Sequence, residues 1–157
     1  MEESSRQRGV GDDPRPKLII KIPGEPQAQE RAGVNTQKGR AAFYEPDASK
    51  NWKEAARWTI AAAVGKPDAE VATVPGAALE VIVTAVHEYI GTDSDAERAW
   101  RTATPDADNI AKCVLDAGNG YLWKDDRQIA RLVVEQFTGG ADEPPCVIIE
   151  VNYLPPC

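Results

Sequence analysis

The sequence has few cysteines, few aromatic residues and no long apolar run. Its three cysteines show no paired metal-ligand spacing, and the odd count argues for free thiols rather than a disulfide framework. No apolar run approaches the roughly 18 residues of a membrane span. The N-terminus also lacks the apolar core of a signal peptide. We therefore expect a cytoplasmic protein with no membrane partner.

Histidine is scarce as well, and a marked excess of positive charge is missing. His87 is the one histidine, and its place near the end of an apolar strand pattern predicts a packed or edge residue rather than a catalyst.

The net charge of −7 argues against a nucleic-acid partner. However, residues 17–53 hold seven Lys/Arg against four Asp/Glu, whereas residues 54–100 hold three against eight. A local basic patch can still bind phosphates, so DNA is not excluded.

The chain has the length and composition of one folded domain, with 157 residues, 42% of them hydrophobic and 27% charged. Residues 1–16 are polar and predict a flexible tail before a domain at 17–157. Strand patterns occur at 17–22, 41–46, 79–89, 127–137 and 146–154, and helix patterns at 47–65 and from about residue 106. This order predicts an α+β domain, with a mixed or antiparallel sheet of about five strands and two main helices.

Three of the strands carry more specific expectations. The strand at 79–89 is apolar on both faces, which predicts a central strand that is covered on both sides. The strands at 127–137 and 146–154 are joined by the turn-rich stretch TGGADEPP. Such a linker predicts that these two strands form an antiparallel pair.

The aromatic and basic residues outside the strands suggest packing and phosphate contacts. We expect Trp52 and Trp58 to pack along the first helix, and Trp123 to anchor the loop that follows the second. Trp100 lies in the polar connection at 90–104, and it either packs against the protein or stacks on a base of bound DNA. The candidates for phosphate contacts lie in the long loop at 23–40 and after the second helix: Arg31, Lys38, Arg40, Lys124 and Arg127.

The densest group of carboxylates lies in PDADNIAKCVLDAGNGYLWKDD, residues 105–126. Pro105 and Asp106 are suited to begin a helix, and Gly118 and Asn119-Gly120 to end it. Asp108, Lys112 and Asp116 are spaced four apart and so line one helix face. On this spacing alone, a capped surface helix with a ladder of ion pairs is the more common arrangement.

A metal site is the alternative for the same residues. A short return after the helix could bring Asp126 back toward Asp106 and Asp108. Three carboxylates that meet need a cation between them, and Mg²⁺ takes oxygen ligands together with substrate phosphate. Such a centre suits phosphodiester hydrolysis, and Lys112 one turn along could offset charge on the phosphate.

The ordered combination resembles the RusA-like endodeoxyribonucleases, which are Holliday junction resolvases common in phages and prophages. It comprises the Asp-x-Asp-Asn-x-x-Lys-x-x-x-Asp signature at Asp106 to Asp116, then Trp123 and Asp125-Asp126. A weaker similarity, in IPGEPQAQERAG and GRAAFYEP, extends it to about residues 18–152. The resemblance implies a Mg²⁺-dependent homodimeric nuclease of DNA recombination and repair that nicks four-way junctions symmetrically. It implies metal binding by Asp106, Asp108 and Asp126, and a catalytic role for Lys112.

On this interpretation the remaining polar residues of the segment support the same site. We expect Asp125 to be a further candidate ligand, Asn109 to support the helix start, and Asp116 to be a supporting residue. Mn²⁺ is expected to substitute for Mg²⁺. The chain departs from the family pattern in its loop, where QAQERA carries Arg31 alone among basic residues. A nuclease for other branched DNA and a non-catalytic junction-binding module therefore remain alternatives.

Overall fold

A computed structural model of the chain describes residues 17–157, apart from 30–32, 36–41, 45–46 and 66–70. Its centre is a sheet in the order β1-β7-β4-β6-β5. The strands are β1 (Leu18–Pro23), β4 (Leu79–His87), β5 (Ala99–Trp100), β6 (Ile129–Thr138) and β7 (Cys146–Tyr153). Neighbouring strands are antiparallel, except that β4 and β6 are parallel. The predicted α+β fold with a five-stranded mixed sheet is confirmed, while the predicted tail at 1–16 lies outside the described residues.

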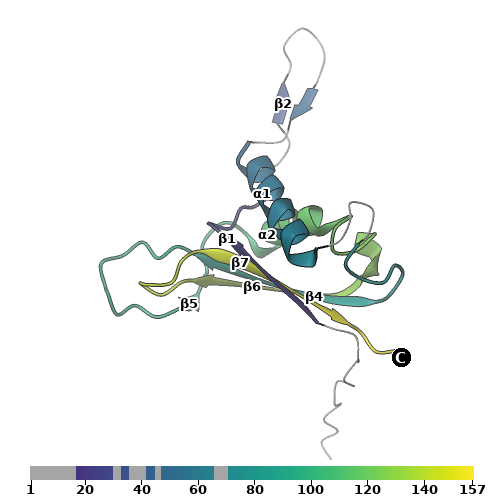
Figure 1. The fold of residues 1–157 in the computed structure, drawn as a ribbon. Coiled ribbons are helices and arrows are strands. Elements are labelled where there is room, and N and C mark those ends of the chain that lie inside the picture. Colours follow the sequence, from purple (N-terminus) through teal and green to yellow (C-terminus); the bar gives the residue numbers. More distant parts are fainter. Residues whose placement is uncertain (1–16, 30–32, 36–41, 45–46, 66–70) are drawn as a thin grey trace, which may run out of the picture.

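The two main helices, α1 (Asp47–Val64) and α2 (Ala107–Gly118), lie on one side of the sheet (Figure 1). Each helix packs through an apolar stripe. On α2 the stripe comprises Ile110, Cys113, Val114 and Ala117, which are all fully buried. This spacing places the four side chains on one helix face. Burial of each large aliphatic side chain stabilises the fold by about 1.5–3 kcal/mol, so this stripe fixes how α2 lies on the sheet.

The central strand β4 is covered by helices on one face only. Leu79, Val81 and Val83 point toward the helices and are fully buried. On the other face Ile82 and Thr84 are partly exposed, and Val86 is buried near the end of the strand. The central position predicted for this strand is confirmed. The predicted cover on both sides is wrong, because both helices pack against the same face of the sheet.

The predicted pairing of the last two strands is also wrong. β6 pairs with β4 and β5, and β7 pairs with β1 and β4, so β4 lies between them. The cause is α2, which connects β4 to β6 as a crossover between parallel strands. This crossover places β6 beside β4, and β7 then occupies the other edge of β4.

Short strands account for the remaining differences. β2 (Gly33–Asn35) and β3 (Ala42–Tyr44) form a two-stranded antiparallel sheet that projects beyond the start of α1 (Figure 1). The strand predicted at 41–46 is thus confirmed as β3, whereas β2 and β5 were not predicted. Strands of two or three residues are too short to show an alternating pattern. Among the described residues, no helix is long and apolar enough to cross a membrane.

Candidate active site

The start of α2 presents two exposed carboxylates. Asp106 is the N-cap residue by its backbone, which is extended at φ −70° and ψ 146°, but its side chain makes no capping hydrogen bond. Asp108 lies in the first turn, and its side chain is 68% exposed. The helix dipole favours carboxylates at this end. Because neither carboxylate is used to cap the helix, both are accessible to a ligand.

Lys112 and Asp116 follow on the same face of α2 but have different partners. Lys112 Nζ lies 3.3 Å from Asp108 Oδ2, and both side chains are largely exposed. Asp116 instead pairs with Lys53 of α1, at 3.5 Å, and its carbonyl accepts a hydrogen bond from Arg57. Asp116 therefore helps to hold α1 against α2. Lys112 has the ion-pair geometry of a surface helix and enough exposure to reach a bound phosphate.

Asn109 supports the start of α2 through its backbone. Its N–H donates to the Asp106 carbonyl at 3.1 Å, and its own carbonyl accepts from the N–H of Gln29 at 2.9 Å. The segment after β1 is thereby attached to the first turn of α2. Both contacts are made by the backbone, so the supporting role expected for the Asn109 side chain stays a prediction.

Asp126 is held by the tryptophan that was predicted to anchor its loop. Trp123 is fully buried, and its Nε1 donates a hydrogen bond of 2.6 Å to Asp126 Oδ1. Its ring packs against the last residue of α2, since a Cβ on Gly118 would lie 2.8 Å from that ring. The predicted anchor is confirmed, and it places Asp126 beside the C-terminal end of α2.

Asp125 caps the short 3₁₀ helix η2 (Asp126–Gln128), and Gln128 completes a capping box with it. Its side chain accepts hydrogen bonds from the Arg127 guanidinium at 2.8 Å and from the Arg127 backbone N–H at 2.9 Å. The guanidinium first, and then the backbone N–H, lower the pKa of Asp125 to about 2. Asp125 is thus engaged in holding the turn that carries Asp126.

The structure does not bring Asp106, Asp108 and Asp126 together within one chain. Asp106 and Asp126 lie at opposite ends of α2, and twelve helical residues span about 18 Å. The turn after α2 is tight: Gly120 has φ +81°, and its N–H bonds the Trp123 carbonyl. The chain therefore enters β6 from the C-terminal end of the helix. Among the described residues, no group of three or more His, Cys, Asp or Glu could hold a metal ion.

The predicted phosphate contacts are only partly within the described residues. Arg31, Lys38 and Arg40 lie outside them. Lys124 and Arg127 are exposed and, with Gly76, Asp125 and Gln128, line an open hollow of about 460 Å³. Arg127 already pairs with Asp125. This hollow places two basic side chains at the end of α2 that carries Asp126.

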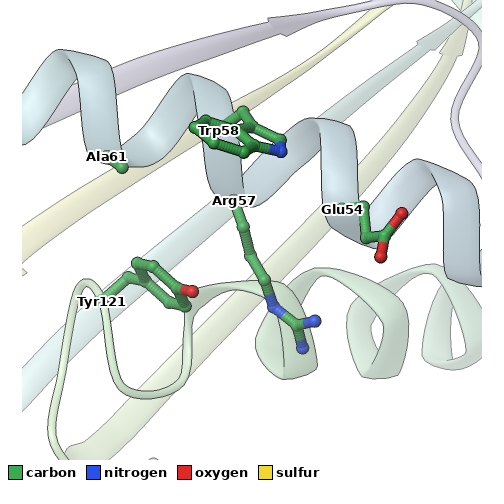
Figure 2. Close-up of a pocket in the computed structure, with 5 residues that line it drawn as sticks. All are labelled: Glu54, Arg57, Trp58, Ala61 and Tyr121. Atoms are coloured by element: carbon green, nitrogen blue, oxygen red, sulfur yellow. The ribbon is translucent and has the colours of Figure 1, made fainter. Parts of the chain in front are cut away.

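The tryptophans divide into buried and exposed residues. Trp52 is buried as predicted, but Trp58 is 80% exposed, so the prediction that it packs along the first helix is wrong. Trp58 lies on the outer side of α1, at a hollow of about 340 Å³ that Arg57 and Tyr121 also line (Figure 2). Trp100 is 68% exposed, and its ring stacks on Phe137 with centroids 4.4 Å apart. Trp100 therefore presents an aromatic face to solvent on the strand that leads toward Asp106.

Comparisons with known proteins point to one family. A family model described as "Endodeoxyribonuclease RusA" matches residues 23–152, a range that contains every candidate site residue. The chain is also similar to "Uncharacterized protein YqaN" of Bacillus subtilis (strain 168). The two are 27% identical over 134 residues, which cover 82% of this chain and 93% of that protein.

Proposed function

Since the chain belongs to the RusA endodeoxyribonuclease family, we propose that it is a Mg²⁺-dependent endonuclease that resolves four-way DNA junctions by paired symmetric nicks. Membership of this family implies nuclease activity on Holliday junctions. The observation that best supports the finer proposal is the start of α2, where Asp106 and Asp108 are exposed and neither caps the helix. Both residues lie within the matched range.

The side chains at the start of α2 have the chemistry that Mg²⁺ requires. The ion prefers oxygen ligands and is commonly held by one or two carboxylates together with substrate phosphate. Asp106 and Asp108 would supply these carboxylates, with Mn²⁺ able to replace Mg²⁺. When bound, the ion would activate a water molecule and neutralise charge on the phosphate. Lys112, released from Asp108, would then turn its ammonium group toward the scissile phosphate.

Asp126 would join this site from a second chain. It lies about one helix length from Asp106 in its own chain, so a shared centre requires a partner subunit. A four-way junction has near two-fold symmetry and needs two nicks, which matches a C2 homodimer with two identical sites. In such a dimer, Asp126 of the partner subunit would complete the ligand set at Asp106 and Asp108. Asp125 would position Asp126 through the η2 turn and remains a further candidate ligand.

Contacts with DNA would come from basic and aromatic side chains around these sites. Lys124 and Arg127, with Arg31, Lys38 and Arg40 in the long loop, are the proposed phosphate contacts. The exposed ring of Trp100 is a candidate to stack on an unpaired base at the branch point. The number of phosphate contacts sets how steeply affinity falls as salt rises, so these few contacts predict a shallow dependence of junction binding on salt.

The proposal is tested with a synthetic four-way junction, a flap, a replication fork and a linear duplex, each incubated with protein and Mg²⁺. We expect paired nicks in the junction and little cleavage of the duplex. Asp108→Asn should abolish the nicks and leave junction binding largely intact, because it removes a charge without removing bulk. A wild-type protein that binds junctions but does not cut them with Mg²⁺ or Mn²⁺ would overturn the catalytic proposal. If the flap or the fork is cleaved as fast as the four-way junction, the protein is a nuclease for other branched DNA.

A further inference from the structure

His87 connects two parts of the chain that meet near the start of α2. His87 lies at the end of β4, and the residue is 1% exposed. Nδ1 lies 2.8 Å from Glu25 Oε1, and Nε2 lies 2.8 Å from Gln136 Oε1. Gln136 Nε2 then donates a hydrogen bond of 3.0 Å to the carbonyl of Pro105. A chain of hydrogen bonds therefore runs from Glu25 to the residue that precedes Asp106.

The partners decide which ring nitrogens carry protons. A backbone carbonyl only accepts, so the Gln136 amide must turn its NH₂ to Pro105 and its oxygen to His87. The opposite orientation would set two oxygens against each other. Nε2 of His87 must therefore be a donor.

Glu25 holds the other side of the ring. Glu25 Oε1 faces Nδ1, and Glu25 Oε2 accepts a hydrogen bond of 2.9 Å from the backbone N–H of Glu88. The ring is therefore held from both sides, and Nε2 stays directed at the Gln136 oxygen.

Gln136 holds the connection before α2 at two points. Its side chain bonds the Pro105 carbonyl, and its backbone carbonyl accepts from the N–H of Arg101 at 3.0 Å. Asp106 makes no capping bond of its own, so its direction depends on the backbone that Pro105 fixes. A shift of about 1 Å in a reacting group can cost about 100-fold in rate.

We propose that His87 is a positioning residue that acts through Gln136 to fix the Pro105–Asp106 backbone and so to aim the Asp106 carboxylate. The inference rests on the proposed role of Asp106 in the nuclease site. His87 itself touches neither substrate nor metal. Its part is to lock the orientation of the Gln136 amide through the N–H at Nε2, which a ring with an acceptor at Nε2 would not do.

The hydrogen bond at Nε2 is tested by NMR on protein labelled with ¹⁵N-histidine, in which His87 gives the single imidazole signal set. We expect Nε2 to carry a proton that is held in a hydrogen bond. Gln136→Met, which removes the acceptor at Nε2, should shift the Nε2 signal. Asn152→Leu removes a comparable bridging amide between Glu80 and Glu150 on the open face of the sheet and should leave the ring signals unchanged. A wild-type ring whose Nε2 carries no proton would overturn the inference.

The positioning is tested with Gln136→Glu, which keeps an acceptor for His87 but loses the donor to Pro105. We expect shifted backbone amide signals from Asp106 to Asn109, and nicking slowed about 10- to 100-fold with junction affinity unchanged. Asn152→Leu should nick like the wild type. Amide signals and nicking that both match the wild type would overturn the positioning role. The NMR measurements need no activity, so a wild type that never cuts would contradict the proposed function alone.

Discussion

Among single residues, Lys112 is the one whose role is least determined by its contacts. Its 3.3 Å contact with Asp108 is a common i,i+4 ion pair, and an exposed pair of this kind stabilises a helix by about 0.3–0.5 kcal/mol. The same exposure leaves its ammonium group free to meet a phosphate. Stability and activity must therefore respond differently if Lys112 acts on the substrate.

We predict that Lys112→Met lowers the free energy of unfolding by less than about 0.5 kcal/mol but slows junction nicking by at least about 100-fold. Urea unfolding and single-turnover nicking measure the two quantities. Lys50→Met, at an exposed position on α1, is the matched control and should change neither. If the Lys112→Met protein nicks junctions at the wild-type rate, Lys112 is only a member of an ordinary surface ion pair.

Trp123 contributes a hydrogen bond to Asp126 as well as packing. We predict that Trp123→Phe, which keeps an aromatic ring but loses the indole N–H, destabilises the fold by roughly 1–2 kcal/mol. Nicking should slow by about 10-fold or more, because Asp126 loses the donor that orients it. Denaturant unfolding and nicking at a temperature where both proteins are folded provide the test.

The exposed Trp58 supplies the control for this substitution, since Trp58→Phe should leave stability and nicking near the wild-type values. A Trp123→Phe protein that nicks at the wild-type rate would show that the orientation of Asp126 is unimportant. The two variants make the same chemical change in a buried and an exposed ring, so their difference isolates the effect of the buried contact.

The sequence singled out residues that form a recognisable order and missed those that act through space. Asp106, Asp108 and Lys112 were proposed from the resemblance to the family signature, and the Trp123 anchor from its place just before Asp125 and Asp126. Glu25 and Gln136 were missed, because a polar residue in a loop or an alternating strand has no signature of its partner. Trp58 was assigned to packing since an apolar side chain on a helix is more often buried than exposed.

Among the elements, the turn after α2 has the clearest dependence on pH. The Arg127 guanidinium and backbone N–H lower the pKa of Asp125 to about 2. A lowered pKa means that the η2 cap contributes fully above the ordinary value of about 3.9 and is lost as pH falls through about 2. We predict that the Asp125 carboxyl remains ionised at pH 3.5, measured by ¹³C NMR titration. Arg127→Gln should raise this pKa, and a wild-type value near 3.9 would contradict the capping contacts.

The elements themselves were predictable where they are long, and their arrangement was not. β1, β4, β6, β7 and both helices follow from periodic patterns. The neighbours of β4 depend on the α2 crossover, which joins two strands that are far apart in the sequence. The residue pattern of neither strand shows that the two lie side by side. For the same reason the place of Asp126 was uncertain, because only the packing of Trp123 on Gly118 shows which end of α2 it occupies.

For the whole molecule, the separation of Asp108 and Asp126 leads to a prediction about the dimer. If each site takes Asp126 from the partner subunit, mixing Asp108→Asn with Asp126→Asn creates dimers with one intact site and one doubly altered site. We predict that the mixture makes single nicks in a junction, whereas each variant alone is inactive. Refolding the two variants together and analysing nicks on each strand provides the measurement. A mixture that stays inactive although its subunits have exchanged would place each site within one chain.

The central claim, that the start of α2 holds the catalytic metal, is tested most directly by a crystal structure of the protein soaked with Mn²⁺, which anomalous scattering locates. We predict Mn²⁺ bound by Asp106 and Asp108, at oxygen distances of about 2.1 Å, with Asp126 of the partner subunit close by. Mn²⁺ bound elsewhere, with Asp106 and Asp108 free in a protein that cuts junctions, would contradict the account.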